Sequence, residues 1–374
     1  MLPYNIEFFR NNMGLLEYVH RDMASNLVID DDYISSNASS LEIGSTDRVK
    51  NGDYIYIKND EINFLGVVSD VSPGEYATKI SYRPFVSVFN EDFLFDTHLQ
   101  GSRSSVSLEQ TIINYLTSLY VNPPDAYQRL PILVTTDIPS AQQTMHWSLN
   151  LTPDVEGSHY TIIGLYTVLI VNSLKKYGIA IRVRPSFTQK KFILTISKST
   201  RTLNIDGDLD NVTVKTLKHN DRPTGVNKLT VYNSDNYSMS VTFYVHTDRS
   251  FSTEDSTNRI TPVVREVRDA TPDSSITDPT EAFLAAAADV ASSVLSGIQW
   301  DNLIELETFV SDENVRPMEM EIGQTIKLWY KGGMYQSILT GKTIGTDGIT
   351  LLFGSERIQY SKRYNKVWRK NQNA

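Results

Sequence analysis

Two short stretches of the chain approach the patterns of ligand-binding loops. Gly341-Lys342-Thr343 ends like a phosphate-binding loop, but the first glycine of that motif falls on Gln336, so the stretch is predicted to be a β-turn. Asp206-Gly-Asp208-Leu-Asp210 has the alternating carboxylates of a calcium loop, yet its twelfth position, which needs a glutamate, is Leu217. Asp30-Asp31-Asp32 is typical of a solvated turn. We therefore expect no metal ion and no cofactor.

Two carboxylate pairs have residue types that could serve glycoside hydrolysis. Glu305 and Glu307 lie two residues apart on a predicted strand, as do Glu319 and Glu321, so each pair shares one face. Such neighbours are about 7 Å apart, whereas a retaining mechanism needs about 5–5.5 Å between its carboxyl groups. Both pairs are interpreted as parts of a solvated face, and we predict that the protein is not an enzyme.

The histidines are scattered and form no pair at metal-ligand spacing. His146 and His159 flank a polar loop and could meet, but no serine elbow or similar motif accompanies them. The chain has no cysteine, which excludes disulfides, thiolate zinc sites and cysteine nucleophiles. The histidines are His20, His98, His146, His159, His219 and His246.

The charge of the chain bears on nucleic acid. A net charge of −9 disfavours a duplex-binding surface, whereas an acidic wall would repel DNA and so suits a passage for it. The basic run Lys362–Lys370 is interpreted as a flexible end or a contact with an acidic neighbour.

The chain shows no sequence signal for secretion or for a membrane helix. Met1–Asn12 is not a secretory signal, and the apolar run Tyr160–Val171 is shorter than the roughly 20 residues of a membrane helix. We expect synthesis in the cytoplasm and no membrane anchor.

Three helices are predicted. Ser107 caps the first, over Leu108–Tyr120. The second is predicted over Tyr160–Tyr177, although its β-branched residues also allow a strand. The third begins at Pro279, behind the capping residue Asp278, and stops at a glycine. Its predicted buried stripe is Phe283, Leu284, Ala287, Val290, Ala291, Val294, Leu295 and Ile298.

The rest of the chain is predicted to be mainly β. From about Asn26 to Phe95, short alternating runs are separated by turn signals. Asp248–Asp278 is polar and is predicted to be a linker around one short strand, Thr261–Val267. Further strands are predicted over Tyr54–Ile57, Phe64–Val68, Ala77–Tyr82, Ile179–Val183, Lys191–Ser197, Val212–Leu217, Lys228–Tyr232, Ser238–His246, Asn302–Val310 and within Ile322–Tyr360.

Two distant segments repeat one pattern without a gap. Gly52 to Val68 aligns on Gly323 to Leu339: a turn glycine precedes a strand with apolar residues two apart, and a second strand opens with an aromatic residue. A further strand follows in each copy. The alternative is that unrelated β-hairpins resemble one another; if the repeat is real, one chain carries two similar antiparallel barrels.

The repeat, the helix-bearing insert between its copies and the last segment resemble one family, the baseplate hub or tail-associated (Tal-type) proteins of long-tailed phages. The likeness covers nearly the whole chain and is greatest to the short hubs of lactococcal siphophages. The residues that carry it are Gly52-Asp53-Tyr54-Ile55, Ile80-Ser81-Tyr82-Arg83-Pro84, Tyr177-Gly178-Ile179, Val315-Arg316-Pro317, Ile322-Gly323-Gln324, Ser337-Ile338-Leu339-Thr340-Gly341 and Phe353-Gly354-Ser355-Glu356-Arg357.

The resemblance implies an α+β, mainly β fold with two similar antiparallel β-barrel domains and inserted mixed α/β domains. It divides the chain into a first barrel over residues 1–100, an inserted α/β domain over 101–200, and a second barrel with a basic tail over 301–374. Residues 201–300 would hold strands, a linker and the helix that leads into the second barrel.

The resemblance also implies a structural function in the virion, at the tail tip or baseplate. Three copies would form a ring of six barrels that docks on the hexameric distal tail protein, closes the tail tube and opens for DNA ejection during host entry. Receptor-binding proteins and the tape-measure protein are further expected partners, and phage DNA would pass without specific binding. The assembly interface is expected around Gly52, Ile55, Ile57, Phe64, Gly323, Ile326, Leu328 and Tyr335.

Two other functions remain open from the sequence. One is a tail-associated cell-wall hydrolase that uses carboxylates in the middle of the chain. The other is a carbohydrate-binding adhesin, since 20 tyrosines and 4 tryptophans could supply platforms on which sugars stack.

Overall fold

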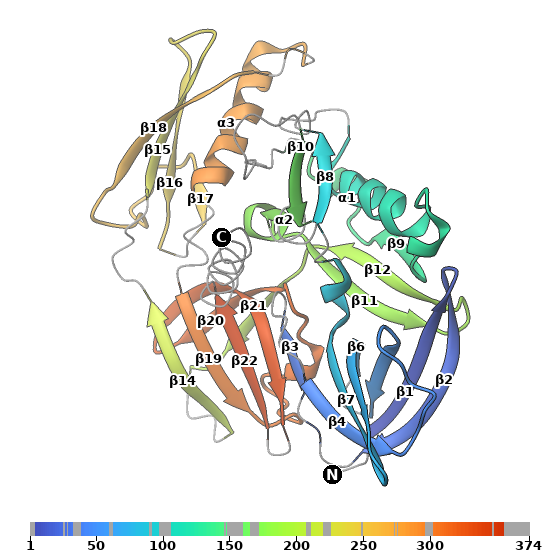
Figure 1. Cartoon of the computed structure of the whole chain (residues 1–374). Helices are drawn as coiled ribbons and strands as arrows, with labels where there is room; N and C mark the ends of the chain where they lie inside the picture. Colours follow the sequence, from blue (N-terminus) through green and yellow to red (C-terminus); the bar gives the residue numbers. More distant parts are fainter. Residues whose placement is uncertain are drawn as a thin grey trace, which may run out of the picture.

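A computed structural model of the chain describes residues 4–24, 27, 29–32, 39–59, 63–89, 92–96, 106–145, 147, 160–164, 172–206, 211–219, 226–247, 250–272, 274, 276–295, 302–345 and 348–354. Two curled sheets lie side by side, and an inserted α/β unit and a small sheet with a helix lie above them (Figure 1). The structure is α+β and mainly β, with two barrel-like sheets, as the sequence predicted.

The first sheet is built by the N-terminal part of the chain. All neighbouring strands in it are antiparallel, and it curls until β2 approaches β4, where the Gly44 amide donates to Asp22 Oδ2 at 2.7 Å. The hairpin of β1 and β2 precedes the region that the sequence identified as β-rich, and its inward residues Tyr4, Ile6 and Phe8 are buried. In spatial order the strands are β2 (Leu15–Ala24), β1 (Tyr4–Asn12), β5 (Tyr54–Lys58), β6 (Asn63–Pro73), β7 (Ala77–Pro84) and β4 (Ser39–Gly44).

The second sheet combines strands from three distant parts of the chain. Strands β13 and β14 come from residues 200–219, and β3 (Ile29–Asp32) crosses from the N-terminal part to pair with β21. Asp30-Asp31-Asp32 was predicted to be a solvated turn; this is wrong, because β3 forms a ladder with Gly341–Ile344. The strand order is β13 (Thr200–Asn204), β20 (Thr325–Tyr330), β21 (Gly333–Ile344), β22 (Ile349–Gly354), β19 (Asn302–Thr308) and β14 (Val212–His219).

The two sheets repeat one three-stranded unit, and the offset in residue number is constant from Gly52 and Gly323 onward. Strand pairs in β5–β6 have counterparts in β20–β21: Ile55 faces Gly66 as Ile326 faces Ser337. The third strands also correspond, since β6 and β21 shift register against β7 and β22 at the same position, a β-bulge.

The turns that open the two units are also equivalent. Gly52 has φ +86° and donates its amide to Val68 O at 2.9 Å, and Gly323 has φ +87° and donates to Leu339 O at 2.7 Å. Both backbones are in the left-handed region that favours glycine. The sequence repeat is therefore a structural duplication of two similar units.

The inserted α/β unit packs on the first barrel. Ser107 caps α1 as predicted, because its Oγ accepts from the Gln110 amide at 3.1 Å. The Gln110 side chain donates to Asn114 Oδ1 at 2.9 Å, one turn further along the helix. After α1 (Leu108–Leu116) the chain continues as a π-helix over Thr117–Val121. The sheet of this unit has β11 (Ala180–Ser186), β12 (Lys191–Ser197) and β9 (Ile132–Thr136).

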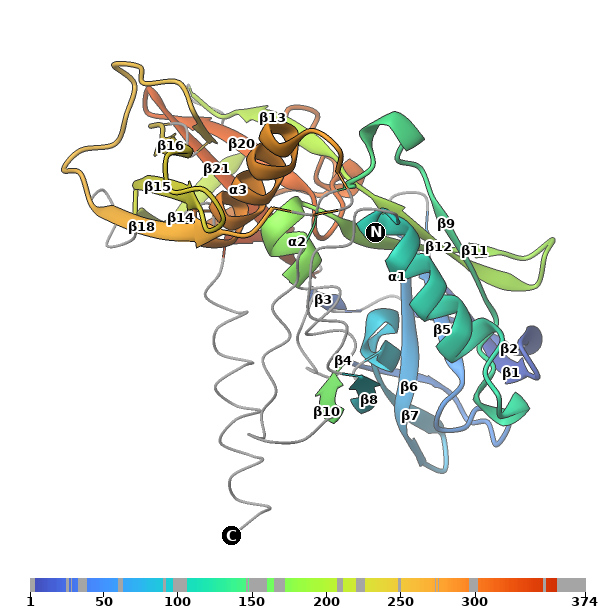
Figure 2. The same cartoon turned by 90° about the horizontal axis from the view of Figure 1, so that it is seen from above.

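A third unit stands apart from the barrels, and α3 (Pro279–Leu295) covers its sheet (Figures 1 and 2). Asp278 caps α3 as predicted, accepting from the Thr280 amide at 2.8 Å. Phe283 is buried, but Leu284 is 47% exposed, so its place in the predicted buried stripe is wrong; Ile298 lies outside the described residues. The sheet has β17 (Phe251–Ser252), β16 (Ser240–Val245), β15 (Lys228–Asn233) and β18 (Arg265–Ala270).

Three local predictions are corrected. The predicted second helix begins as strand β10 (Tyr160–Gly164), paired with β8 (Asp92–Asp96), and is helical at α2 (Asn172–Tyr177). Three β-branched residues in succession favour the extended form there. Gly341-Lys342-Thr343 lies within β21 and is not a turn, and the strand predicted over Thr261–Val267 begins only at Arg265.

We predict that Gly52→Ala lowers the free energy of unfolding by about 1 kcal/mol, because alanine resists the left-handed conformation. A Cβ at Gly52 would contact nothing within 4 Å, so the effect isolates the backbone. Gly345→Ala is the control, since Gly345 has no such φ and its new Cβ would meet only Gly348 O at 3.9 Å. Chemical denaturation measures both; equal effects would contradict the assigned conformation.

Candidate functional site

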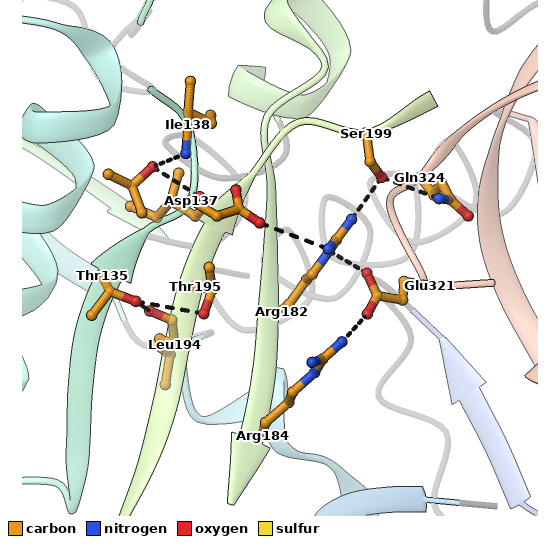
Figure 3. A network of polar contacts seen from close by, with 12 residues as sticks. Thr135, Asp137, Ile138, Arg182, Arg184, Leu194, Thr195, Ser199, Glu321 and Gln324 are labelled. Carbon is orange, nitrogen blue, oxygen red and sulfur yellow. Dashed lines mark hydrogen bonds and ion pairs between the residues drawn. The ribbon is translucent and has the colours of Figure 1, made fainter. Parts of the chain in front are cut away.

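A polar network joins the inserted sheet to the turn that opens the second barrel (Figure 3). Arg182 on β11 forms an ion pair through Nε with Glu321, and its Nη2 donates to Ser199 Oγ at 2.6 Å. Arg184, two residues further along β11, donates to Glu321 Oε1 at 2.7 Å. Ser199 Oγ also accepts from Gln324 Nε2 at 3.2 Å. Two arginines of one unit thus hold one carboxylate of another; we call these five residues the arginine network.

The geometry of a strand explains the arginine network. Arg182 and Arg184 are two residues apart and therefore lie on one face of β11. The side chains of Arg182 and Glu321 are 21% and 27% exposed, so water screens their attraction only in part. In the sequence, the signal for this site is the pair Arg182 and Arg184, two residues apart at the end of a predicted strand, a pair that does not indicate its partner Glu321.

The equivalent turn of the first barrel is bound by a different arginine, Arg10. Asp53, at the repeat position of Gln324, accepts two bonds from Arg10 of β1, both 2.7 Å long, and a third from the Lys50 amide at 2.8 Å. Asp53 is 2% exposed, and its hydrogen bond raises the pKa of the Arg10 guanidinium. The first turn is thus fixed within its own barrel, whereas the second is fixed to the inserted unit.

A cleft of about 540 Å³ lies beside the arginine network, where both barrels and β11 meet. Its lining combines apolar side chains such as Phe64, Phe187 and Met320 with the charged residues Arg182, Glu321 and Lys342. Lys342 is 7% exposed, and its Nζ donates to the Met320 carbonyl. Burial lowers the pKa of Lys342 to about 8, against the attraction of nearby carboxylates.

The residues expected at the assembly interface lie largely in the interior. The side chains of Ile55, Ile57, Phe64, Ile326 and Leu328 are at most 4% exposed and fill the common core of the two barrels. Gly323 is buried, Tyr335 is half-buried and Gly52 is exposed. An interface at these hairpins would therefore use the backbone and the outward-facing neighbours of these residues.

Neighbouring strands and turns supply partners for the carboxylates considered for catalysis. Glu307 pairs with Lys215 at 3.0 Å and Glu305 accepts from Thr216 at 3.4 Å, both on β14. Glu319 faces Arg201 at 3.5 Å, while Glu321 belongs to the arginine network. The Asp206 carboxylate accepts the Gly332 amide at 2.9 Å and so fixes the β20–β21 hairpin. Asp208 and Asp210 lie outside the described residues.

Two of the described histidines, His20 and His246, have structural contacts. His20 stacks on Phe8 with ring centroids 6.2 Å apart. His246 Nε2 lies 2.9 Å from Ser252 Oγ, but its Nδ1 lies 3.3 Å from Ser256 Oγ, so a hydroxyl stands where a catalytic triad has a carboxylate. His219 ends β14. His98, His146 and His159, and the basic run Lys362–Lys370, lie outside the described residues.

In the described part of the chain, no group of three or more histidine, aspartate or glutamate side chains is placed to hold a metal ion. Among the same residues, no helix is both long and apolar enough to cross a membrane.

No protein-family model matches the chain, and no curated protein matches it. Among solved structures, the chain is similar to prophage tail protein gp18 from Listeria monocytogenes EGD-e, with 11% identity, a TM-score of 0.50, and coverage of 98% of this chain and 99% of that one. It is also similar to a tail protein from Neisseria meningitidis MC58 (11% identity, TM-score 0.47, covering 94% and 97%) and to a chain of the phage P2 baseplate (12%, 0.44, 94% and 98%). The chain therefore shares the fold of the gp18 tail protein.

We predict a strong coupling between Arg182 and Glu321 in a double-mutant cycle of Arg182→Met and Glu321→Gln. The coupling free energy should be about 1.5–3 kcal/mol, because the bond is charge-assisted and partly desolvated. The matched control is Lys215→Met with Glu307→Gln, whose side chains are 49% and 42% exposed and should couple by less than about 1 kcal/mol. Thermal unfolding measures both cycles, and equal coupling would contradict this role.

We also predict that Lys342 gives the protein a stability that rises with pH between 8 and 10. In that range the unfolded chain holds the lysine proton and the folded chain has released it, so raising the pH favours folding. Between pH 8 and pH 10, the free energy of unfolding of the wild type should rise by roughly 2–3 kcal/mol relative to that of the Lys342→Met variant. Burial raises the pKa of Tyr54 and Tyr82, which lowers stability above pH 10, but equally in both proteins. Parallel pH profiles would contradict the buried charge.

Proposed function

We propose that this chain is a structural hub of a phage tail tip. Three copies form a ring of six barrels that docks on the hexameric distal tail protein and adapts its sixfold symmetry to threefold. The function rests on shape and symmetry, and no chemical step is part of it.

The observation that carries the proposal is the duplicated three-stranded unit. Two barrels with the same turn, register and bulge give each chain two nearly equivalent surfaces. A closed ring of three such chains has six similar units, which matches a sixfold partner. The fold shared with a prophage tail protein supports the same assignment.

The charge and the inserted units support the second part of the proposal. The ring surrounds the path of the DNA, and an acidic chain with a net charge of −9 lets DNA pass without holding it. The inserted units close the tube and move away when the host is bound. The arginine network is a joint between one inserted unit and the ring, and ion pairs at such a joint can exchange partners without breaking a core.

We expect light scattering to give three times the chain mass of 42.3 kDa at micromolar concentration. Electron microscopy of the protein mixed with a hexameric distal tail protein should then show a threefold cap on a sixfold ring. A strict monomer that does not bind the ring would contradict the proposal. A lytic band on host cell walls would favour a hydrolase instead, and glycan binding that is lost on aromatic substitution would favour an adhesin.

A further inference from the structure

The cleft beside the arginine network has an exposed end and a buried end. At the exposed end, Phe187 is 43% exposed and Arg184 extends into solvent. At the buried end lie Phe64 of the first barrel and Met320 and Lys342 of the second. The cleft therefore opens to solvent on the side of the inserted unit and ends between the barrels. Its volume of about 540 Å³ is in the range of sites that hold small molecules, and such sites often lie where separate units meet.

The buried end of the cleft holds a cation with donors to spare. An ammonium group has three N–H donors, and the hydrogen bond that the described residues give to Lys342, to the Met320 carbonyl, uses one of them. Asp31 and Glu321 attract this charge, and burial opposes it. A buried charge is costly unless further acceptors reach it. The two remaining donors are thus available to an acceptor that enters the cleft.

The charges of the lining set the charge of that acceptor. Arg182, Arg184 and Lys342 are cations and Asp31 and Glu321 are carboxylates, so the formal charge of the lining is +1. Both oxygens of Glu321 already bind the two arginines (Figure 3). Asp31 lies opposite Lys342 in the ladder of β3 and β21. One further negative charge balances the lining, and the ammonium group is the cation that has donors left for it.

The rest of the lining suits an apolar body. Phe64 on β6 and Phe187 after β11 contribute aromatic rings from two different sheets, and Met318 and Met320 contribute flexible apolar side chains. Tyr56 adds a ring whose hydroxyl already donates to an asparagine at 2.9 Å. An apolar group in the cleft therefore contacts carbon on several sides and leaves no hydroxyl of Tyr56 without a partner.

We propose that the cleft binds a small amphipathic carboxylate, with the carboxylate group on Lys342 and the hydrocarbon or aromatic part against Phe64 and Phe187. Such a ligand contacts both barrels and the inserted unit at once. It therefore fastens the inserted unit to the barrels beside the arginine network. The inference goes beyond the proposed function, because neither the ring nor its docking requires a ligand.

Titration calorimetry of the full chain with octanoate tests the inference. The titration is done at pH 7, where Lys342, whose pKa is about 8, carries its charge. Acetate has the carboxylate without the chain, and 1-octanol has the chain without the charge. We expect octanoate to bind once per chain, and the other two at least about tenfold more weakly, because each lacks one of the two kinds of contact.

Substitutions separate the two contacts. Lys342→Met should weaken octanoate binding by at least about tenfold and leave 1-octanol binding unchanged, because methionine removes the charge and keeps an apolar stem. Phe187→Ala should weaken the binding of both. Lys215→Met is the matched control and should leave octanoate binding unchanged, since Lys215 lies on β14, pairs with Glu307 and is not part of the lining.

Three results would overturn the inference: no binding of octanoate, octanoate binding no tighter than that of 1-octanol, or equal octanoate binding by wild type and the Lys342→Met variant. Each of them leaves the proposed function standing, because that function is tested by the mass of the assembly and by its docking on a sixfold ring.

Discussion

The pairing of β3 with β21 is the contact on which the rest of the arrangement depends. It joins positions 313 residues apart in the chain, as in the hydrogen bond from Thr343 Oγ1 to Asp30 Oδ1. Because β4 follows β3 and pairs with β7, this ladder sets the first barrel beside the second. The apolar interiors of the two sheets then form one contiguous core, so neither barrel is an independent unit of stability.

On this common frame the two copies have diverged in their side chains and not in their backbones. The turn of the first barrel is held by Arg10 and Asp53 within one sheet. The same turn of the second barrel is held by arginines of β11 through Glu321. One copy therefore closes on itself and the other binds the inserted unit, although their amide and carbonyl bonds are the same. Duplication followed by changes of charge is sufficient to give two equivalent units different neighbours.

Much of the fold could be predicted because its signals are local. Capping residues, turn glycines and alternating apolar positions identified α1, α3 and the repeated hairpins from the residues themselves. The predictions that were wrong concern segments whose secondary structure depends on pairing with a strand far away in the sequence. The run at Tyr160 is extended because β8 pairs with it, and Asp30-Asp31-Asp32 is extended because β21 does. The polar site was missed for the same reason, since nothing near Arg182 in the sequence indicates Glu321.

Lys342 shows how a costly residue can serve this arrangement. A buried ammonium group destabilises the fold. The equivalent position of the first barrel holds Val71, which shows that the backbone of this strand does not require a lysine. On one face of the short ladder, Ile29 lies opposite Ile344 and Asp31 opposite Lys342. A slip of two residues would place Ile29 opposite Lys342 and leave its charge without the facing carboxylate, so the lysine penalises the wrong register. A four-residue strand that joins two barrels has few other means of fixing its register, and specificity at the seam offsets what the buried charge costs.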